Sequence, residues 1–272
     1  MSEAVIAATA PSPPGRRLRF RHVLLLINVG AVATVFLLWW SATRFGWIAP
    51  IFLPAPGDVW HAARLTMRNG ELLTDVAVSA RRVFLGFGLA ALIAVPLGVV
   101  MGVWQPAKAI MDPFVSLLRP LPSITWIPLT ILWLGIGEAQ KIAIVFMGSW
   151  IYILLYTVES TRRVDPLLVR AARNLGASDL AVMKEVILPG SLPGIIAGLK
   201  VTLAISWSCV LTAEMIAAQS GLGALIWQAK DWGNLALVLV GMLCISLTVL
   251  VADWVMVRLE QLLLPWERSR RS

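Results

Sequence analysis

Six apolar stretches follow one another along the chain, with shorter polar segments between them. They cover residues 23–40, 83–104, 121–136, 142–158, 195–218 and 235–257. About 20 apolar residues are needed for an α-helix to cross the hydrocarbon core of a bilayer, and these stretches are close to that length. The pattern predicts an all-α integral membrane protein with a six-helix transmembrane domain over 23–258, flanked by tails at 1–22 and 259–272.

The third stretch differs from the others because prolines precede and interrupt it. They are Pro113, Pro120, Pro122 and Pro128. Proline has no backbone N–H to donate, and its ring disturbs the preceding helical turn. Backbone groups freed in this way must find partners inside the protein when the segment lies in a membrane. We therefore expect this segment to be kinked and packed against protein rather than lipid.

Composition supports the membrane interpretation. The 272 residues are 58% hydrophobic and 14% charged, with a mean hydropathy of +0.81. A soluble domain has about 25% charged residues. The formal net charge of +8 is better explained by cytoplasmic loops rich in Lys and Arg than by binding to nucleic acid. Cys209 and Cys244 lie inside apolar runs without metal-ligand spacing, so we expect neither a disulfide nor a metal site.

The distribution of basic residues predicts the orientation in the membrane. If the N-terminus is cytoplasmic, only seven of the 23 Lys and Arg residues fall outside. These seven are Arg44, Arg64, Arg68, Arg81, Arg82, Lys141 and Lys230. Basic residues accumulate on the cytoplasmic side, so both termini are expected there.

The longest cytoplasmic loop covers about residues 159–194 and carries its own helix signals. Asp165 followed by Pro166 is a favourable helix start, and Gly176 is suited to a left-handed helix end. A second helix is predicted from Ser178 to just before Pro189. The two helices form a corner that suits docking into a groove of another protein. The residues alone are equally consistent with a loop that packs against its own bundle.

This loop resembles the signature loop of binding-protein-dependent ABC importer permeases, which reads Glu-Ala-Ala, three residues, Gly, nine residues, Ile-x-Leu-Pro. The matching positions are Ala171, Ala172, Gly176, Leu188 and Pro189, with Val186 in place of the isoleucine. Arg170 stands where the signature has Glu. The resemblance implies that the loop couples the permease to an ATPase.

Short strings elsewhere are similar to the nitrate, sulfonate, taurine and bicarbonate branch of that family. They include Arg82-Val83-Phe84-Leu85-Gly86-Phe87, Arg119-Pro120-Leu121-Pro122, Trp133-Leu134-Gly135-Ile136-Gly137 and Gly221-Leu222-Gly223. The resemblance implies a type I ABC importer permease in the bacterial cytoplasmic membrane. It also implies three partners: a cytoplasmic ABC ATPase dimer, a second permease subunit (an identical copy), and a periplasmic or lipid-anchored substrate-binding protein. The implied cargo is a small anion such as a sulfonate, taurine or nitrate.

Four residues of the fifth stretch are candidates for the pathway or a gate. Ser206 and Trp207 lie near mid-membrane, although packing between helices explains each of them somewhat better than a pathway role. Thr212 and Glu214 lie further along. An ionisable residue in a membrane helix is a functional candidate. Glu214 falls about 28 Å from Ile195 along a helix, near the outer edge of the bilayer. We expect it close to the Gly221–Gly223 turn, in an outer-gate or structural role, because a carboxylate repels an anion.

The sequence contains no phosphate loop of the form Gly-x-x-x-x-Gly-Lys-Ser/Thr. ATP hydrolysis is therefore expected on a separate chain, and no cofactor is expected on this one. The alternative is a secondary transporter or channel that works without an ATPase. Such proteins have charged residues or paired broken helices at mid-membrane, for which Glu214 is the single candidate.

Overall fold

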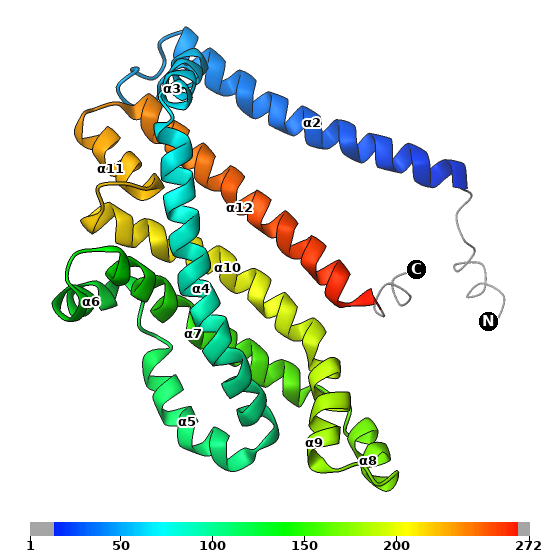
Figure 1. Cartoon of the computed structure of the whole chain (residues 1–272). Coiled ribbons are helices and arrows are strands. Elements are labelled where there is room, and N and C mark those ends of the chain that lie inside the picture. The colour runs from blue at the N-terminus through cyan, green and yellow to red at the C-terminus, as the bar shows by residue number, and fades with distance from the viewer. Residues whose placement is uncertain (1–13, 266–272) are drawn as a thin grey trace. The chain divides into compact units, whose positions relative to one another are not determined.

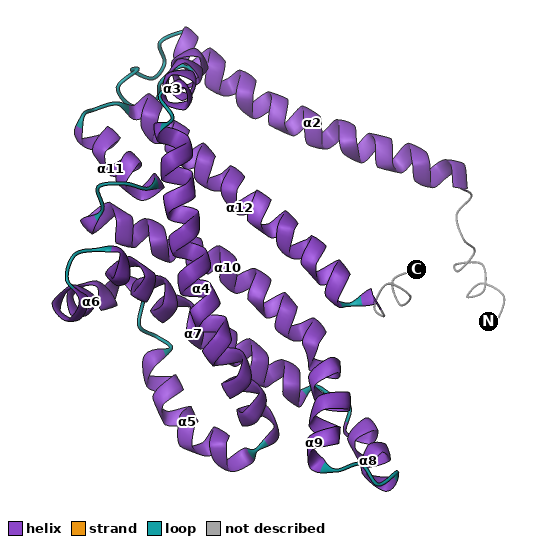
Figure 2. Ribbon diagram, in the orientation of Figure 1, coloured by secondary structure: helices purple, strands orange, loops and turns teal. Residues whose placement is uncertain are grey.

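The computed structural model describes the backbone of residues 14–265 and the side chains of 26–216 and 218–265. Residues 1–13 and 266–272 of the two predicted tails lie outside this range. All regular structure within it is helical, with short connecting loops (Figure 2). The chain divides into two compact units, residues 1–61 and 62–272, which are described separately.

The first unit consists of one long helix and the turn that follows it. Helix α2 covers Pro14–Arg44 and therefore begins before the predicted start at Val23. The indole Nε1 of Trp39 donates a hydrogen bond to the backbone oxygen of Pro54 at 3.0 Å, which fastens the turn to the helix. Helix α3 covers Pro56–Arg68 and continues into the second unit.

Four long helices form the second unit: α4 (Glu71–Val103), α7 (Glu138–Arg162), α10 (Leu188–Ala217) and α12 (Leu235–Leu263). Each belongs to a segment that is long and apolar enough to cross a membrane, as is the Leu26–Arg44 part of α2. A bent pair of shorter helices brings the number of candidate spans in the described residues to six. The predicted six-span, all-helical fold is thereby confirmed.

The third span is not the single helix predicted for residues 121–136. It consists of α5 (Gln105–Leu118), the 3₁₀ turn η2 (Ser123–Trp126) and α6 (Ile127–Leu134), with a bend of 91° between the two parts. Pro122 adopts an extended conformation at the bend, so the predicted kink is confirmed. The expected burial is wrong within a single subunit, because Leu132 and Trp133 are 79% and 61% exposed.

Helix α7 packs between α4 and α10, and small residues bring the three backbones together. A Cβ atom added to Gly98 of α4 would lie 2.6 Å from Thr157 of α7, and one added to Gly198 of α10 would lie 2.4 Å from Tyr156. Close backbone approach through small residues is the usual basis of helix association in membranes, where lipid is as apolar as leucine. About half of the apolar windows of α7 and α10 is buried within the subunit, but only 17% of that of α12.

Helix α4 begins well before the predicted start at Val83. Its 33 residues extend about 50 Å, whereas the hydrocarbon core is about 30 Å thick. Helix α4 is therefore longer than a perpendicular span requires. Arg82 was placed outside the spans because it precedes Val83; it is instead an α4 residue with 2% of its surface exposed. Lys141 likewise belongs to α7 rather than to a loop.

Short helices form the two ends of the second unit. At one end lie α8 (Pro166–Asn174), α9 (Asp179–Ala181) and the π-helical turn η3 (Val182–Ile187). At the other end α11 (Leu222–Asp231) follows the C-terminus of α10 (Figure 1). Helix α10 connects these two groups of short helices directly.

Candidate functional site

The first candidate site is the corner between α8 and α9. Asp165 caps α8, and its Oδ1 accepts a hydrogen bond from the Leu167 N–H at 2.8 Å. Ser178 caps α9, and its Oγ accepts from the Ala181 N–H at 3.3 Å. Side-chain oxygens at these positions satisfy amides that have no partner within the helix. The two helix starts predicted from the sequence are thus confirmed.

Gly176 makes the corner possible. Its φ of +86° lies in the left-handed region, which side chains with a Cβ rarely adopt. Its N–H donates to the Arg173 oxygen at 3.0 Å, and the Ala177 N–H donates to the Ala172 oxygen at 3.1 Å, as is typical of a helix end. A Cβ at Gly176 would meet no atom within 4 Å. The glycine is therefore required by backbone conformation and not by space.

The second helix of the loop does not end before Pro189, as the sequence had suggested. It passes through η3 into α10, so that residues from Asp179 to Ile216 form one continuous helical segment. Proline lacks an N–H and its ring collides with the carbonyl four residues earlier in a regular helix. A wider π-helical turn just before Pro189 relieves that collision. Val186, Leu188 and Pro189 thus lie at the junction that joins the corner to the membrane helix.

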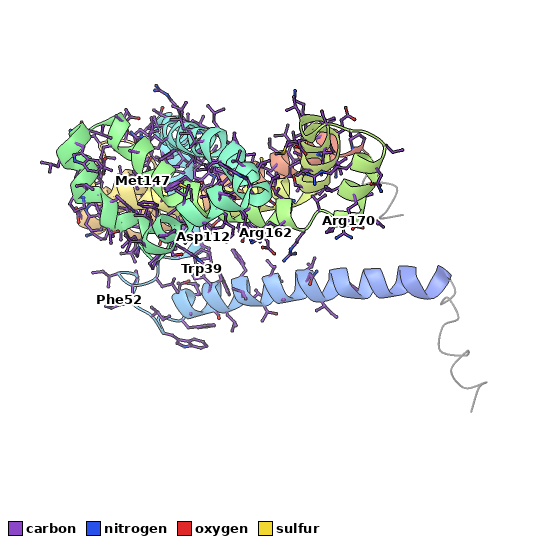
Figure 3. All side chains as sticks on the ribbon, turned by 90° about the horizontal axis from the view of Figure 1, so that it is seen from below. Trp39, Phe52, Asp112, Met147, Arg162 and Arg170 are labelled. Atoms are coloured by element: carbon purple, nitrogen blue, oxygen red, sulfur yellow. The ribbon has the colours of Figure 1, made fainter. Side chains whose placement is uncertain are left out.

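The outer surface of this corner is rich in exposed side chains of two kinds. The apolar ones are Leu167, Leu168, Leu175 and Leu180, with Leu175 89% exposed. Arg170 is exposed as well and has no hydrogen-bond or ion-pair partner among the described residues (Figure 3). Ala171 is exposed next to it. Arg173 bridges the two helices through a 3.1 Å contact with Asp179.

The second candidate site surrounds Glu214 at the other end of α10. The carboxylate is fully buried, and four hydrogen bonds reach it. Ser79 lies 2.8 Å from Oε1 and 2.9 Å from Oε2, Arg82 Nη1 donates to Oε1 at 2.7 Å, and the Gly223 N–H donates to Oε2 at 2.9 Å. The predicted closeness of Glu214 to the Gly221–Gly223 turn is confirmed. Its role stays a prediction.

The turn reaches Glu214 because it contains glycines. A Cβ at Gly221, whose φ is +112°, would lie 2.5 Å from the Glu214 Cδ, and one at Gly223 would lie 2.7 Å from the Glu214 Cβ. The carboxylate thereby lies against the N-terminus of α11, where free amides and the helix dipole favour a negative charge. The Gly221 N–H is held from the other side by Asp75 Oδ1 at 2.7 Å.

Arg82 connects this buried carboxylate to α7. Its Nε donates to Glu138 Oε2 at 2.9 Å, and its Nη2 pairs with Glu138 Oε1, which gives a bidentate ion pair. Its Nη1 also donates to the backbone oxygen of Ser220 at 2.7 Å. The side chain of Glu138 is 50% exposed, whereas that of Arg82 is 2% exposed. One guanidinium thus joins α4, α7, α10 and the loop before α11.

The proposed pathway residues of α10 are placed differently from one another. Ser206 is buried and contacts Ser149 of α7 at 2.7 Å, and Trp207 is buried with 1% of its surface exposed. Both therefore pack within the subunit. Thr212 is partly exposed, and its hydroxyl donates to the Ser208 backbone oxygen at 2.9 Å. Of the four candidate residues on α10, Thr212 is the one whose side chain reaches the subunit surface.

Sequence reasoning identified Glu214 but not its side-chain partners Ser79 and Arg82, nor Glu138, which pairs with Arg82. The sequence did contain a reason to look for partners, because a carboxylate buried in a membrane helix needs a cation or several hydrogen-bond donors. Arg82 immediately precedes the apolar stretch predicted to begin at Val83, so it was counted among the residues outside the spans. The pairing of residues 132 positions apart in the chain has no local sequence pattern.

A bundle of membrane-spanning helices that presents an exposed helical corner, with no nucleotide-binding motif of its own, is the architecture of a transporter subunit that works with a separate ATPase. The chain belongs to the family of binding-protein-dependent transport system inner membrane components, which matches residues 94–264. It is a non-catalytic, multi-pass permease subunit of an ABC importer.

Relatives and a solved structure agree with this assignment. The taurine transport system permease protein TauC of Escherichia coli (strain K12) is 32% identical over 92% of this chain and 94% of its own length. The putative aliphatic sulfonates transport permease protein SsuC of the same strain is 33% identical over 93% and 95%. A chain of the inward-facing MetNI methionine ABC transporter has the same fold, with a TM-score of 0.65 at 22% identity over 72% of this chain and 97% of that one.

Proposed function

We propose that this permease pairs with a second copy of itself to form the pathway for a small anion of the sulfonate, taurine or nitrate class. Two cytoplasmic ATPase subunits would dock at the α8–α9 corners, and an external binding protein would deliver the anion. The names of the relatives TauC and SsuC support the sulfonate class. The proposed orientation, with both termini cytoplasmic, follows from the basic residues of the loops.

The exposed surface of the α8–α9 corner carries the docking proposal. Leu175 and Leu180 are 89% and 63% exposed on short helices that project beyond the membrane segments. Apolar side chains in water are stabilised when a partner covers them, by about 25 cal/mol for each Å² removed from water. Arg170 adds a cation without an internal partner to the same surface. The physical properties of this surface are those of a helix that docks into a groove.

For the pathway, we propose that the partly exposed side of α10 around Thr212 faces the passage. Ser206 and Trp207 support it from within the subunit, because they are buried against neighbouring helices. Glu214 has a different proposed role, at an outer gate. Its carboxylate is fully buried and accepts hydrogen bonds from Ser79, Arg82 and Gly223, so a substrate does not reach it in this conformation.

The docking proposal is tested by placing a charge on the corner. Leu175→Asp should abolish co-purification of the ATPase while the permease still inserts in the membrane. The matched control is Leu73→Asp, which changes a 62% exposed leucine at the start of α4 and should leave ATPase binding unchanged. Equal ATPase binding by Leu175→Asp and the unchanged protein would show that the corner is not the docking surface.

Substrate class is tested in proteoliposomes that contain permease, ATPase and binding protein. ATP-dependent uptake of a labelled sulfonate is expected, with competition by other sulfonates. Uptake that continues without the ATPase would instead support a secondary transporter or channel. Uptake of cations or sugars without uptake of anions would contradict the anion assignment.

A further inference from the structure

The ionic cluster at the outer end of α10 has two parts that differ in their access to water. Ser79, Arg82 and Glu214 form the inner part, and their side chains are 2% exposed or less. Glu138 forms the outer part, and half of its side chain surface is exposed in the single subunit. Both parts share the guanidinium of Arg82.

The two parts differ in how easily they separate. Breaking the contact between Arg82 and Glu214 would leave two buried groups without partners, since water does not reach them. Breaking the contact between Arg82 and Glu138 leaves a carboxylate that water can hydrate, because it is already half exposed. Arg82 would keep Glu214 and the Ser220 oxygen as partners. The inner part is thus permanent under ordinary conditions, and the outer contact is separable.

The backbone before Glu138 provides freedom for that separation. Glu138 is the first residue of α7, and it follows Gly135 and Gly137. Gly135 has a φ of +72°, and a Cβ on either glycine would meet no atom within 4 Å. The short helix α6 is therefore attached to α7 through an unobstructed Gly-Ile-Gly connection. Movement of α6 about this connection acts directly on the residue that carries the outer carboxylate.

We infer that Arg82 is a positioning residue for transport, which holds the outer end closed through a separable ion pair with Glu138 while it stays fixed to Glu214. Opening of the outer end breaks the Arg82–Glu138 pair and leaves the Ser79–Arg82–Glu214 part intact. The ion pair thereby sets how strongly ATP hydrolysis depends on a loaded binding protein. This inference rests on the proposed function for its readout, which is coupling to the ATPase.

The test compares variants in proteoliposomes that contain the whole complex, and it measures ATP hydrolysis with and without loaded binding protein together with uptake. Glu138→Gln removes the outer charge and leaves the buried pair in place. We expect basal hydrolysis to rise about fivefold, at the low end of coupling free energies, with more ATP hydrolysed for each anion moved. Glu138→Asp keeps the charge, so the amount of ATP hydrolysed for each anion moved should return toward that of the protein without substitutions.

Arg82→Lys is the second variant, because lysine keeps a charge beside Glu214 but cannot form the fork that holds Glu138. It should raise basal hydrolysis as Glu138→Gln does. The matched control is Asp231→Asn, which neutralises a 55% exposed carboxylate paired with Lys230 on α11 and should change nothing.

Each outcome decides one question. A lower melting temperature for Glu138→Gln with an unchanged ratio of ATP to anion would show a purely structural ion pair and overturn the inference. If the complex without substitutions takes up anions with ATP and Glu138→Gln behaves in the same way, the inference is overturned as well. The proposed function then stands. Absence of ATP-dependent uptake by the unchanged complex would instead count against the proposed function.

Discussion

The two ends of α10 carry polar groups arranged in opposite ways. At the α8–α9 corner, the exposed Arg170 side chain has no hydrogen-bond or ion-pair partner among the described residues, and the apolar side chain of Leu175 is exposed as well. At the other end, both oxygens of Glu214 and every nitrogen of the Arg82 guanidinium have partners inside the chain. Groups that are exposed and unpaired within the subunit are available to contact another molecule. A fully satisfied buried network indicates an element that holds the subunit's own helices together.

This difference predicts that substitutions at the two ends fail in different ways. Changes in the buried cluster should act first on stability and on closure of the outer end. Changes at the exposed corner should act on ATPase binding and leave the fold intact. The substitutions below test that contrast, from the largest expected effect to the smallest.

Arg82→Ala should have the largest effect. It leaves the buried Glu214 carboxylate without its cation, and breaking a buried ion pair from one side destabilises a protein by about 3 to 5 kcal/mol. We expect little folded permease in detergent, measured by size-exclusion chromatography and thermal unfolding. Arg81→Ala is the control, because Arg81 is the neighbouring residue and is exposed. Normal yield and melting temperature for Arg82→Ala would contradict the structural role of the pair.

Glu214→Gln should have the next largest effect. Glutamine keeps nearly the volume of glutamate and one of its two acceptor oxygens. In the structure, Arg82 donates to one carboxylate oxygen and Gly223 to the other, so the amide nitrogen of glutamine must face a donor. Hydrogen bonds to charged groups contribute about 1.5 to 3 kcal/mol.

We therefore expect Glu214→Gln to lower the melting temperature and to raise basal ATP hydrolysis. Thr248→Val on α12 is a suitable comparison, because the Thr248 hydroxyl bonds only to the Cys244 backbone oxygen of its own helix among the described contacts. If Glu214→Gln has the melting temperature and basal ATP hydrolysis of the protein without substitutions, the second acceptor oxygen of Glu214 is not needed. The shape of the side chain would then be sufficient.

Gly176→Val should act at the other end and spare the fold. Valine at a φ of +86° is strained by about 1 to 3 kcal/mol, which the chain avoids by opening the corner. We expect ATPase affinity to fall about tenfold or more, since 1.4 kcal/mol corresponds to a factor of ten. Ala177→Val is the control at an ordinary φ. Pull-down titration measures both, and equal affinities would disprove the need for a left-handed corner.

Arg170→Glu should have the smallest effect. Arg170 occupies the acidic position of the signature, so we expect its ATPase partner to present an acidic or neutral contact there. A surface ion pair is worth less than about 1 kcal/mol unless it is desolvated. The loss of affinity should be largest at low salt and disappear as salt screens the charges. Arg162→Glu is the control at an exposed arginine of α7 (Figure 3). Affinity that does not depend on salt would remove the electrostatic role.

Local patterns predicted the corner well, because its determinants lie within a few residues of one another. Asp165, Gly176 and Ser178 act on neighbouring amides, and their effects were visible in the sequence. The passage through Pro189 was missed, since a proline usually ends a helix and nothing local indicated the π-helical turn. The six apolar stretches gave the fold class for the same reason, as length and hydropathy are local properties.

The buried cluster could be predicted only in part. Glu214 and its nearby glycines are nine residues apart or fewer, and their contact was expected. Its pairing with Ser79 and Arg82 depends on how α4 packs against α10, which the periodicity of neither helix specifies. The bend in the third span was expected from its prolines, but its size and the exposure of α6 depend on packing within the subunit.

The most direct test of the docking claim is photo-crosslinking from a benzophenone amino acid at Leu175 in the complex as isolated from membranes. Leu175 is 89% exposed, so a bound ATPase subunit must cover it if the corner is the docking surface. We predict one crosslinked product that contains the ATPase, and none with the ATPase when the same amino acid replaces Leu73. A Leu175 product that contains only lipid or the permease itself would contradict the account.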